Sequence, residues 1–162
     1  MTSDRAATST TDRRPVLDGS GLRVAVVVGR FNDAINEKLL AGCRATLAAN
    51  GVAESDVTEL WVPGAYELPL IAKKLAESGR HDAVVAIGSV IRGDTPHFDY
   101  VAGECAAGLT RASLDTGVPV VFGVLTTDDV DQAEARAGGI LGNKGCEFAE
   151  TAIEMARLLA QL

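Results

Sequence analysis

Residues 83–101 read AVVAIGSVIRGDTPHFDYV, and this stretch decides the fold that we expect for the whole chain. Its first nine residues form a nearly continuous apolar run, which is typical of a strand buried on both faces of a parallel sheet. A polar turn at residues 92–95 ends that run. Thr95 is well placed as a helix N-cap, and Pro96 suits the first position of a helix that continues to about Asp115. The stretch therefore predicts a buried parallel strand followed directly by a helix.

His97 is the candidate catalytic residue of this stretch. It falls in the first turn of the expected helix, where unpaired amide N–H groups and the positive end of the helix dipole disfavour an imidazolium. We therefore expect a largely neutral imidazole near pH 7, able to accept a proton. A histidine in a turn is more often structural or solvated than catalytic, so His97 alone establishes no reaction. The other histidine, His81, lies in the polar turn 79–82 and is interpreted as a solvated loop residue.

Short apolar strands and amphipathic helices alternate on both sides of this stretch. We expect strands at residues 23–28, 57–62, 83–91 and 119–125. A first helix should stop at Asn50-Gly51, and two more are expected at residues 65–78 and 96–115. A shorter helix capped by Thr126-Thr127-Asp128 should run to about Ala137, and a last helix should be capped by Asn143. Four-residue spacing predicts two buried stripes, made of Ile35, Leu39, Cys43 and Leu47 in the first helix and of Phe148, Ala152, Met155 and Leu159 in the last.

This alternation predicts an α/β fold, a doubly wound sheet of four parallel strands with helices on both faces. Ligands of such sheets bind beyond the carboxyl ends of the strands, and four unusual segments fall there: 29–32, 63–67, 88–97 and 122–127. Phe31 and Tyr66 could stack on a planar ligand, although by themselves they are more simply interpreted as hydrophobic plugs. Glu67 could accept hydrogen bonds from hydroxyls or could simply favour the N-terminus of its helix.

Composition narrows the function classes further. The 162 residues fit one domain, assigned to residues 16–162, after an N-terminal segment 1–15 that is rich in Thr, Ser, Asp and Arg and is expected to be disordered. A net charge of −7 argues against a nucleic-acid partner, which needs clustered Lys and Arg.

Metal and cofactor signals are weak. The three cysteines Cys43, Cys105 and Cys146 are far apart and read as small core residues in a reducing compartment, so no metal site is expected. The glycine-containing turns match neither a dinucleotide fingerprint nor a P-loop, so no nucleotide cofactor is indicated. No apolar run has the length of a signal peptide or a membrane span, and we expect a cytoplasmic protein without membrane contact.

Taken together, these segments resemble the lumazine synthases of riboflavin biosynthesis, which make 6,7-dimethyl-8-ribityllumazine. The resemblance runs from about Val16 to the C-terminus, and it is most specific at residues 88–101. Further support comes from residues 29–32, 64–69, 122–127, 136–138 and 142–145. It implies a flavodoxin-like three-layer sandwich with four parallel strands.

The resemblance also implies a reaction. It condenses 5-amino-6-(D-ribitylamino)uracil with 3,4-dihydroxy-2-butanone 4-phosphate through an imine, elimination of phosphate, ring closure and loss of water, with no metal or organic cofactor. Two other interpretations stay open at this point. One is a flavodoxin-like module that binds a flavin or a phosphate without catalysis, and the other is a shell-forming scaffold.

Carried over by position, the resemblance gives each candidate residue a role. His97 moves protons. The residues implied to bind the pyrimidine ring and the ribityl chain are Phe31, Ala65, Tyr66, Glu67, Ser89, Val90, Ile91, Phe122 and Lys144. Those implied to bind the phosphate are Asp94, Thr95 and Arg136. Phe122, Arg136 and Lys144 are expected to reach in from a neighbouring subunit. A carboxylate is repelled by phosphate, so the side chain of Asp94 is expected to turn away and only its amide to contribute.

The resemblance further implies a homo-oligomer. The loop at residues 138–144 is short, and in the family a short loop here accompanies pentamers that assemble into sixty-subunit icosahedral shells. Riboflavin synthase is a possible further partner on the same grounds.

Overall fold

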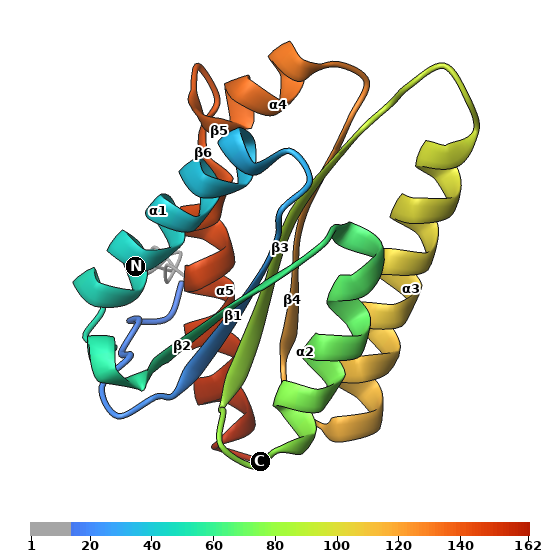
Figure 1. The fold of residues 1–162 in the computed structure, drawn as a ribbon. Helices are drawn as coiled ribbons and strands as arrows, with labels where there is room; N and C mark the ends of the chain where they lie inside the picture. The colour runs from blue at the N-terminus through green and yellow to red at the C-terminus, as the bar shows by residue number, and fades with distance from the viewer. Residues whose placement is uncertain (1–13) are drawn as a thin grey trace, which may run out of the picture.

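The structure is a computed structural model that describes residues 14–162. It contains one four-stranded parallel sheet in the order β2-β1-β3-β4, with helices on both faces (Figure 1). The strands are β1 Val24–Gly29, β2 Val57–Val62, β3 Ala83–Ile91 and β4 Val120–Thr127. The helices are α1 Asp33–Ala49, α2 Leu68–Glu77, α3 His97–Thr116, α4 Val130–Arg136 and α5 Lys144–Leu159. Short 3-10 turns lie before β2, at Glu54–Asp56, and before α2, at Ala65–Glu67. A small hairpin of β5 Ala137–Gly139 and β6 Gly142–Asn143 connects α4 to α5.

This architecture confirms the α/β prediction. All three pairings in the main sheet are parallel, and the strand order is that of a flavodoxin-like fold. Disorder was predicted for residues 1–15, and residues 1–13 of this segment lie outside the described part of the chain.

The two central strands are buried on both faces, and this divides the core in two. On one face, α1 and α5 cover Val24, Val26 and Val28 of β1 with Val85 and Ile87 of β3. On the other face, α2 and α3 cover Ala25 and Val27 with Val84 and Ala86. The continuous apolar runs in the sequence arise because successive side chains of one strand enter different cores.

Three predicted helix starts are shifted along the chain. The helix predicted over residues 65–78 opens with the 3-10 turn Ala65–Glu67, and its α-helical part, α2, begins at Leu68. Helix α3 begins at His97, and its N-cap is Pro96 and not Thr95 as predicted. The Thr95 hydroxyl still accepts the His97 N–H, at 3.4 Å, from the position before the N-cap. Strand β4 runs on to Thr127 because β3 continues to Ile91 and offers it a partner. The predicted cap at residues 126–128 is therefore wrong.

The N-cap of α4 is instead Asp129, whose side chain accepts the Gln132 N–H at 2.8 Å. At the next helix, the predicted cap is confirmed, since Asn143 Oδ1 accepts the Gly145 N–H at 2.8 Å.

The buried stripe predicted for α1 is confirmed, whereas the one predicted for α5 is confirmed at Ala152, which is buried, and Phe148, which packs against the core, and is wrong at the other two positions. Met155 and Leu159 are 38% and 39% exposed, and the buried residues of α5 are Gly145, Ala149, Ala152, Ile153 and Ala156. The reason is the close approach of α5 to α1. A Cβ on Gly145 would lie 1.9 Å from the Leu39 carbonyl oxygen, so no side chain fits at this position, and the other buried positions of α5 are mostly alanines.

The cysteines lie where a core role would place them. Cys43 and Cys105 are buried, and Cys146 is half-buried. Burial raises the pKa of the Cys43 thiol to about 12 and that of Cys105 to about 11, which keeps both protonated and unreactive. Among residues 14–162, no group of three His, Cys, Asp or Glu side chains could hold a metal ion. None of the helices formed by these residues is long and apolar enough to span a membrane.

His81 corrects the sequence interpretation, because it is 7% exposed and not solvated. The turn that carries it is tied down to the start of β1. The Asp82 carboxylate accepts the Arg23 N–H at 2.8 Å and the Arg23 guanidinium at 3.1 Å, while the Asp82 N–H donates to the Arg23 carbonyl. His81 Nδ1 has no hydrogen-bond partner within the described chain.

We predict an acid-sensitive stability that depends on His81. Burial lowers the pKa of His81 below its ordinary value of 6.5, and the nearby Arg80 and Arg23 lower it further, whereas Asp82 acts in the opposite direction. The folded state therefore favours neutral imidazole. The stability that neutral His81 contributes is fully present above the pKa of this histidine in the unfolded chain, and it is lost as pH falls through the pKa in the folded chain. Between about pH 7 and pH 5, we expect Tm to fall more in the wild type than in His81→Gln; parallel declines of the two proteins would contradict this.

Candidate active site

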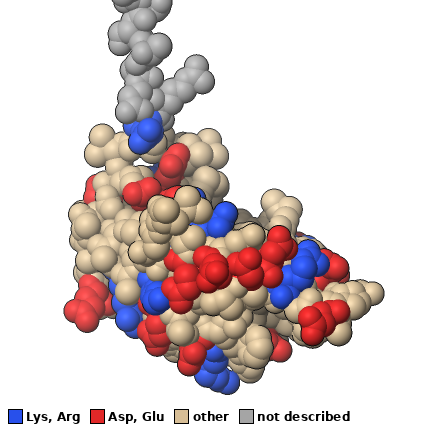
Figure 2. All heavy atoms as spheres, turned by 90° about the horizontal axis from the view of Figure 1, so that it is seen from above, with Lys and Arg blue, Asp and Glu red and all other residues tan. Residues whose placement is uncertain are grey.

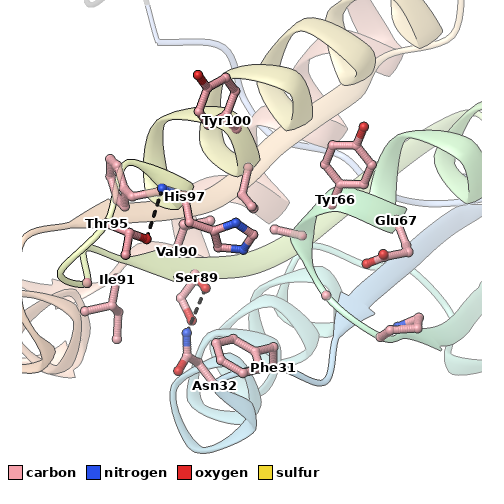
Figure 3. Close-up of a pocket in the computed structure, with 16 residues that line it drawn as sticks. Phe31, Asn32, Tyr66, Glu67, Ser89, Val90, Ile91, Thr95, His97 and Tyr100 are labelled. Atoms are coloured by element: carbon pink, nitrogen blue, oxygen red, sulfur yellow. Dashed lines mark hydrogen bonds between the residues drawn. The ribbon is translucent and has the colours of Figure 1, made fainter.

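A pocket of about 650 Å³ lies beyond the carboxyl ends of β1, β2 and β3, next to the first turns of α3 (Figure 3). Three chain segments form its walls, and each directly follows or ends a strand of the sheet. The lining residues are Phe31, Asn32, Pro63, Gly64, Ala65, Tyr66, Glu67, Ser89, Val90, Ile91, Gly93, Thr95, His97, Phe98, Tyr100 and Val101.

The first wall is the turn between β1 and α1. The Phe31 ring is 74% exposed, although its backbone is fixed: the Phe31 N–H donates to the Pro63 carbonyl at 3.0 Å. Asn32 adopts a left-handed conformation, with φ of 64°, which asparagine tolerates better than most residues. The Asn32 Nδ2 group donates to the Ser89 carbonyl at 3.0 Å and so links this turn to β3.

The second wall is the segment after β2. Gly29 and Gly64 bring the ends of β1 and β2 together, since a Cβ on Gly29 would lie 3.3 Å from the Gly64 carbonyl carbon. Ala65 is buried beneath the wall, whereas Tyr66 and Glu67 are exposed on the 3-10 turn. Figure 3 shows the Glu67 carboxylate and the Tyr66 ring on one side of the pocket, across from His97.

The third wall is the end of β3. Pairing between β1 and β3 stops at Val28 and Ile87, while β3 continues to Ile91 along β4. On the side that faces β1, the backbone of residues 89–91 is therefore not paired with another strand and borders the pocket instead. This wall presents main-chain groups to the pocket, which a planar ligand with hydrogen-bonding edges could use.

His97 completes the pocket from the start of α3. Its imidazole points into the cavity between the end of β3 and the Tyr66–Glu67 segment (Figure 3). The loop before it is held by Arg92, whose guanidinium lies 4.2 Å from the centre of the Phe98 ring and pairs with Asp128 at 3.1 Å and Asp99 at 3.5 Å. Arg92 thus ties the start of α3 to the end of β4.

Three lining residues of α3 were missed in the sequence analysis: Phe98, Tyr100 and Val101. The signal was present for two of them. Positions three and four after His97 lie on the same helical face as His97, so Tyr100 and Val101 could have been proposed from spacing alone.

Four of the predicted site residues do not line this pocket: Asp94, Phe122, Arg136 and Lys144. Arg136 donates to the Gln132 carbonyl of its own helix at 2.9 Å, and Lys144 pairs with Glu147 at 2.8 Å. Phe122 is exposed on the edge strand β4. Among the described residues that line the pocket, none is a lysine or an arginine.

The surface at this end of the sheet is not basic. Figure 2 looks down on it and shows Asp and Glu side chains in a band, with Lys and Arg side chains between and around them. A surface of mixed charge lacks the continuous positive stripe that tracks a phosphate backbone.

The fold and the pocket define an α/β protein of the flavodoxin-like class whose site is built from the turns after three parallel strands and from the first turns of a helix. More particularly, the chain belongs to the 6,7-dimethyl-8-ribityllumazine synthase family, whose model matches residues 21–160. The match includes every strand and helix described above. Family membership supports a lumazine synthase function in riboflavin biosynthesis, and thus a transferase that acts on small molecules.

Proposed function

We propose that the chain condenses 5-amino-6-(D-ribitylamino)uracil with 3,4-dihydroxy-2-butanone 4-phosphate to give 6,7-dimethyl-8-ribityllumazine, phosphate and water. One observation carries this proposal: an exposed aromatic ring, a carboxylate and an imidazole, from three different segments of the chain, surround one cavity. The cavity volume of about 650 Å³ is in the range that holds small molecules. The lining set also suits one substrate that is planar and carries a polyol chain.

The pyrimidine substrate fits the walls formed by β1, β2 and β3. Phe31 offers an exposed face on which the ring stacks. The backbone of residues 89–91, including Ser89, Val90 and Ile91, meets the hydrogen-bonding edge of the ring. Glu67 accepts hydrogen bonds from the ribityl hydroxyls, beside Ala65 and Tyr66.

The phosphate substrate fits the start of α3. The Thr95 hydroxyl and the amides before and within the first turn of the helix form an anion-binding end, to which Asp94 contributes its amide. A phosphate that leaves during the reaction needs its charge held, and an arginine fork does this best. Because the pocket has no cation of its own among the described residues, we assign this role to Arg136 of a neighbouring subunit, together with Phe122 and Lys144 at the pyrimidine.

His97 moves protons between the two substrates. Imine formation, elimination of phosphate and ring closure all require proton transfers, and an imidazole can accept and donate protons near neutrality. Its ring points into the cavity from the helix end that we assign to phosphate (Figure 3). Face-to-face positioning of two substrates supplies much of the remaining rate.

We predict that His97→Ala slows turnover by about tenfold to a thousandfold without unfolding the protein, because acid-base help is lost while positioning remains. The measurement is lumazine formation from both substrates, followed by absorbance and fluorescence, with Tm as the folding control. Unchanged turnover would remove His97 from the mechanism. Absence of product from the wild type would favour a binding module that does not catalyse.

We further propose a pentamer that assembles into a sixty-subunit shell. The support is the short connection between α4 and α5, in which only residues 140 and 141 separate β5 from β6. Sedimentation of the purified protein should show a species of shell size, and pentamers alone in several buffers would contradict the shell.

A shared site predicts complementation between two inactive variants. If His97 and Arg136 of one site come from different chains, His97→Ala and Arg136→Ala proteins that are unfolded, mixed equally and reassembled regain activity. In a cyclic ring, an intact site needs the right variant on each side, so about one quarter of sites recover. Specific activity of the mixture is compared with each variant reassembled alone. A mixture no more active than its parents would show that both residues come from one chain.

A further inference from the structure

Asn36 is a fully buried polar residue that lies beneath the pocket and does not line it. It sits near the start of α1 with 0% exposure, between the buried residues Ile35 and Leu39 of the apolar core. An amide in such surroundings costs free energy unless its hydrogen-bonding groups are satisfied. Its partners therefore indicate why it is there.

Both polar atoms of the Asn36 side chain make hydrogen bonds, three in all. Nδ2 donates to the Gly29 carbonyl at 2.7 Å and to the Phe31 carbonyl at 2.9 Å. Oδ1 accepts the Ser89 hydroxyl at 2.7 Å. Two carbonyl partners on one side fix which end of the amide is the nitrogen. One side chain thus joins the end of β1, the following turn and the end of β3.

These bonds determine where the Phe31 ring lies. The Phe31 N–H is held by the Pro63 carbonyl at 3.0 Å and its C=O by Asn36, so both polar groups of this residue are fixed. The ring itself is 74% exposed and has little packing to hold it. Its position therefore depends on the backbone, and the backbone depends on Asn36.

The same amide sets the opposite wall at Ser89. The Ser89 hydroxyl donates to Asn36, and its carbonyl accepts Asn32 Nδ2 at 3.0 Å. Both bonds cross the gap beyond Val28 and Ile87, where the β1–β3 ladder has ended. Side-chain amides thus replace the ladder and keep the turn at a fixed distance from β3.

We propose that Asn36 is a positioning residue for the pyrimidine subsite: through the Phe31 peptide and Ser89 it sets the spacing between the stacking ring and the backbone edge of residues 89–91. This proposal rests on the proposed function, since it requires that the pyrimidine be a substrate. Asn36 touches no substrate, and it lies on a different element from the phosphate-binding start of α3. Its effect is therefore specific to one substrate.

The test replaces the amide without changing the volume much. Asn36→Leu leaves two carbonyls and one hydroxyl without their partner, whereas Asn36→Asp keeps the acceptor for Ser89 and loses both N–H donors. In both variants we expect the KM for the pyrimidine substrate to rise about tenfold to a hundredfold. The KM for the butanone phosphate should stay within about threefold. If Asn36→Leu does not fold, Asn36→Asp alone carries the comparison.

Leu47→Ala is the matched control. Leu47 is buried on the same helix but lies far along it from the turn, so its truncation lowers Tm without selecting between substrates. Parallel rises of both KM values, or an unchanged pyrimidine KM, in the Asn36 variants would overturn the proposal.

A double-mutant cycle with Phe31→Ala asks whether Asn36 acts through the ring. If it does, Asn36→Leu adds at most about twofold to the pyrimidine KM of Phe31→Ala, because the ring that it positions is already gone. Full additivity of the two effects would overturn the proposal.

Amide hydrogen exchange gives a readout that needs no turnover. Faster exchange at residues 29–32 in Asn36→Leu, with α5 unchanged, is expected if Asn36 orders this turn. Unchanged exchange there would overturn the positioning role. If the wild type forms no lumazine, the proposed function fails, and the exchange result still decides whether Asn36 holds the turn.

Discussion

The parallel pairing of β1 with β3 places two buried strands side by side at the centre of the sheet. Both strands are buried on both faces, so helices must cover each side, and the crossovers return every strand in the same direction. The carboxyl ends of the strands therefore meet at one edge. The turns 29–32, 63–67 and 88–97, which are far apart in the sequence, become neighbours there. The pocket follows directly from the topology.

The site lies where that pairing runs out. A ladder that ends leaves N–H and C=O groups that must find other partners, and here Asn32 and Asn36 supply some of them from the side of the turn. The backbone of residues 89–91 keeps its β1-facing side toward the cavity. The Ser89 carbonyl of this edge is already bonded to Asn32, so the side-chain amides fix the shape of the pocket, while the rest of the edge lies beyond the end of the β1 ladder.

The sequence predicted best what local pattern determines. Strands 57–62 and 83–91 were predicted with their observed bounds, because unbroken apolar runs between turn residues have few alternatives. The pocket residues of the strand ends were found through topology. Features that depend on other segments were missed: the length of β4 is set by β3, and the small-residue face of α5 by its approach to α1. The turn that carries the buried His81 is likewise bonded to a distant residue, Arg23 at the start of β1. Asn36 looks like an ordinary polar position of an amphipathic helix, since no local pattern marks its partners.

None of the described lining residues is a lysine or an arginine, although several of them, among them Phe31, Tyr66 and Thr95, are exposed at the mouth of the cavity. Neutral donors, such as the Thr95 hydroxyl and the start of α3, cost little in an empty site. If the charge comes from a second chain, as we propose for Arg136, each pocket is completed only when two chains meet. Anion binding then depends on assembly, and the single chain retains the shape of the pocket alone.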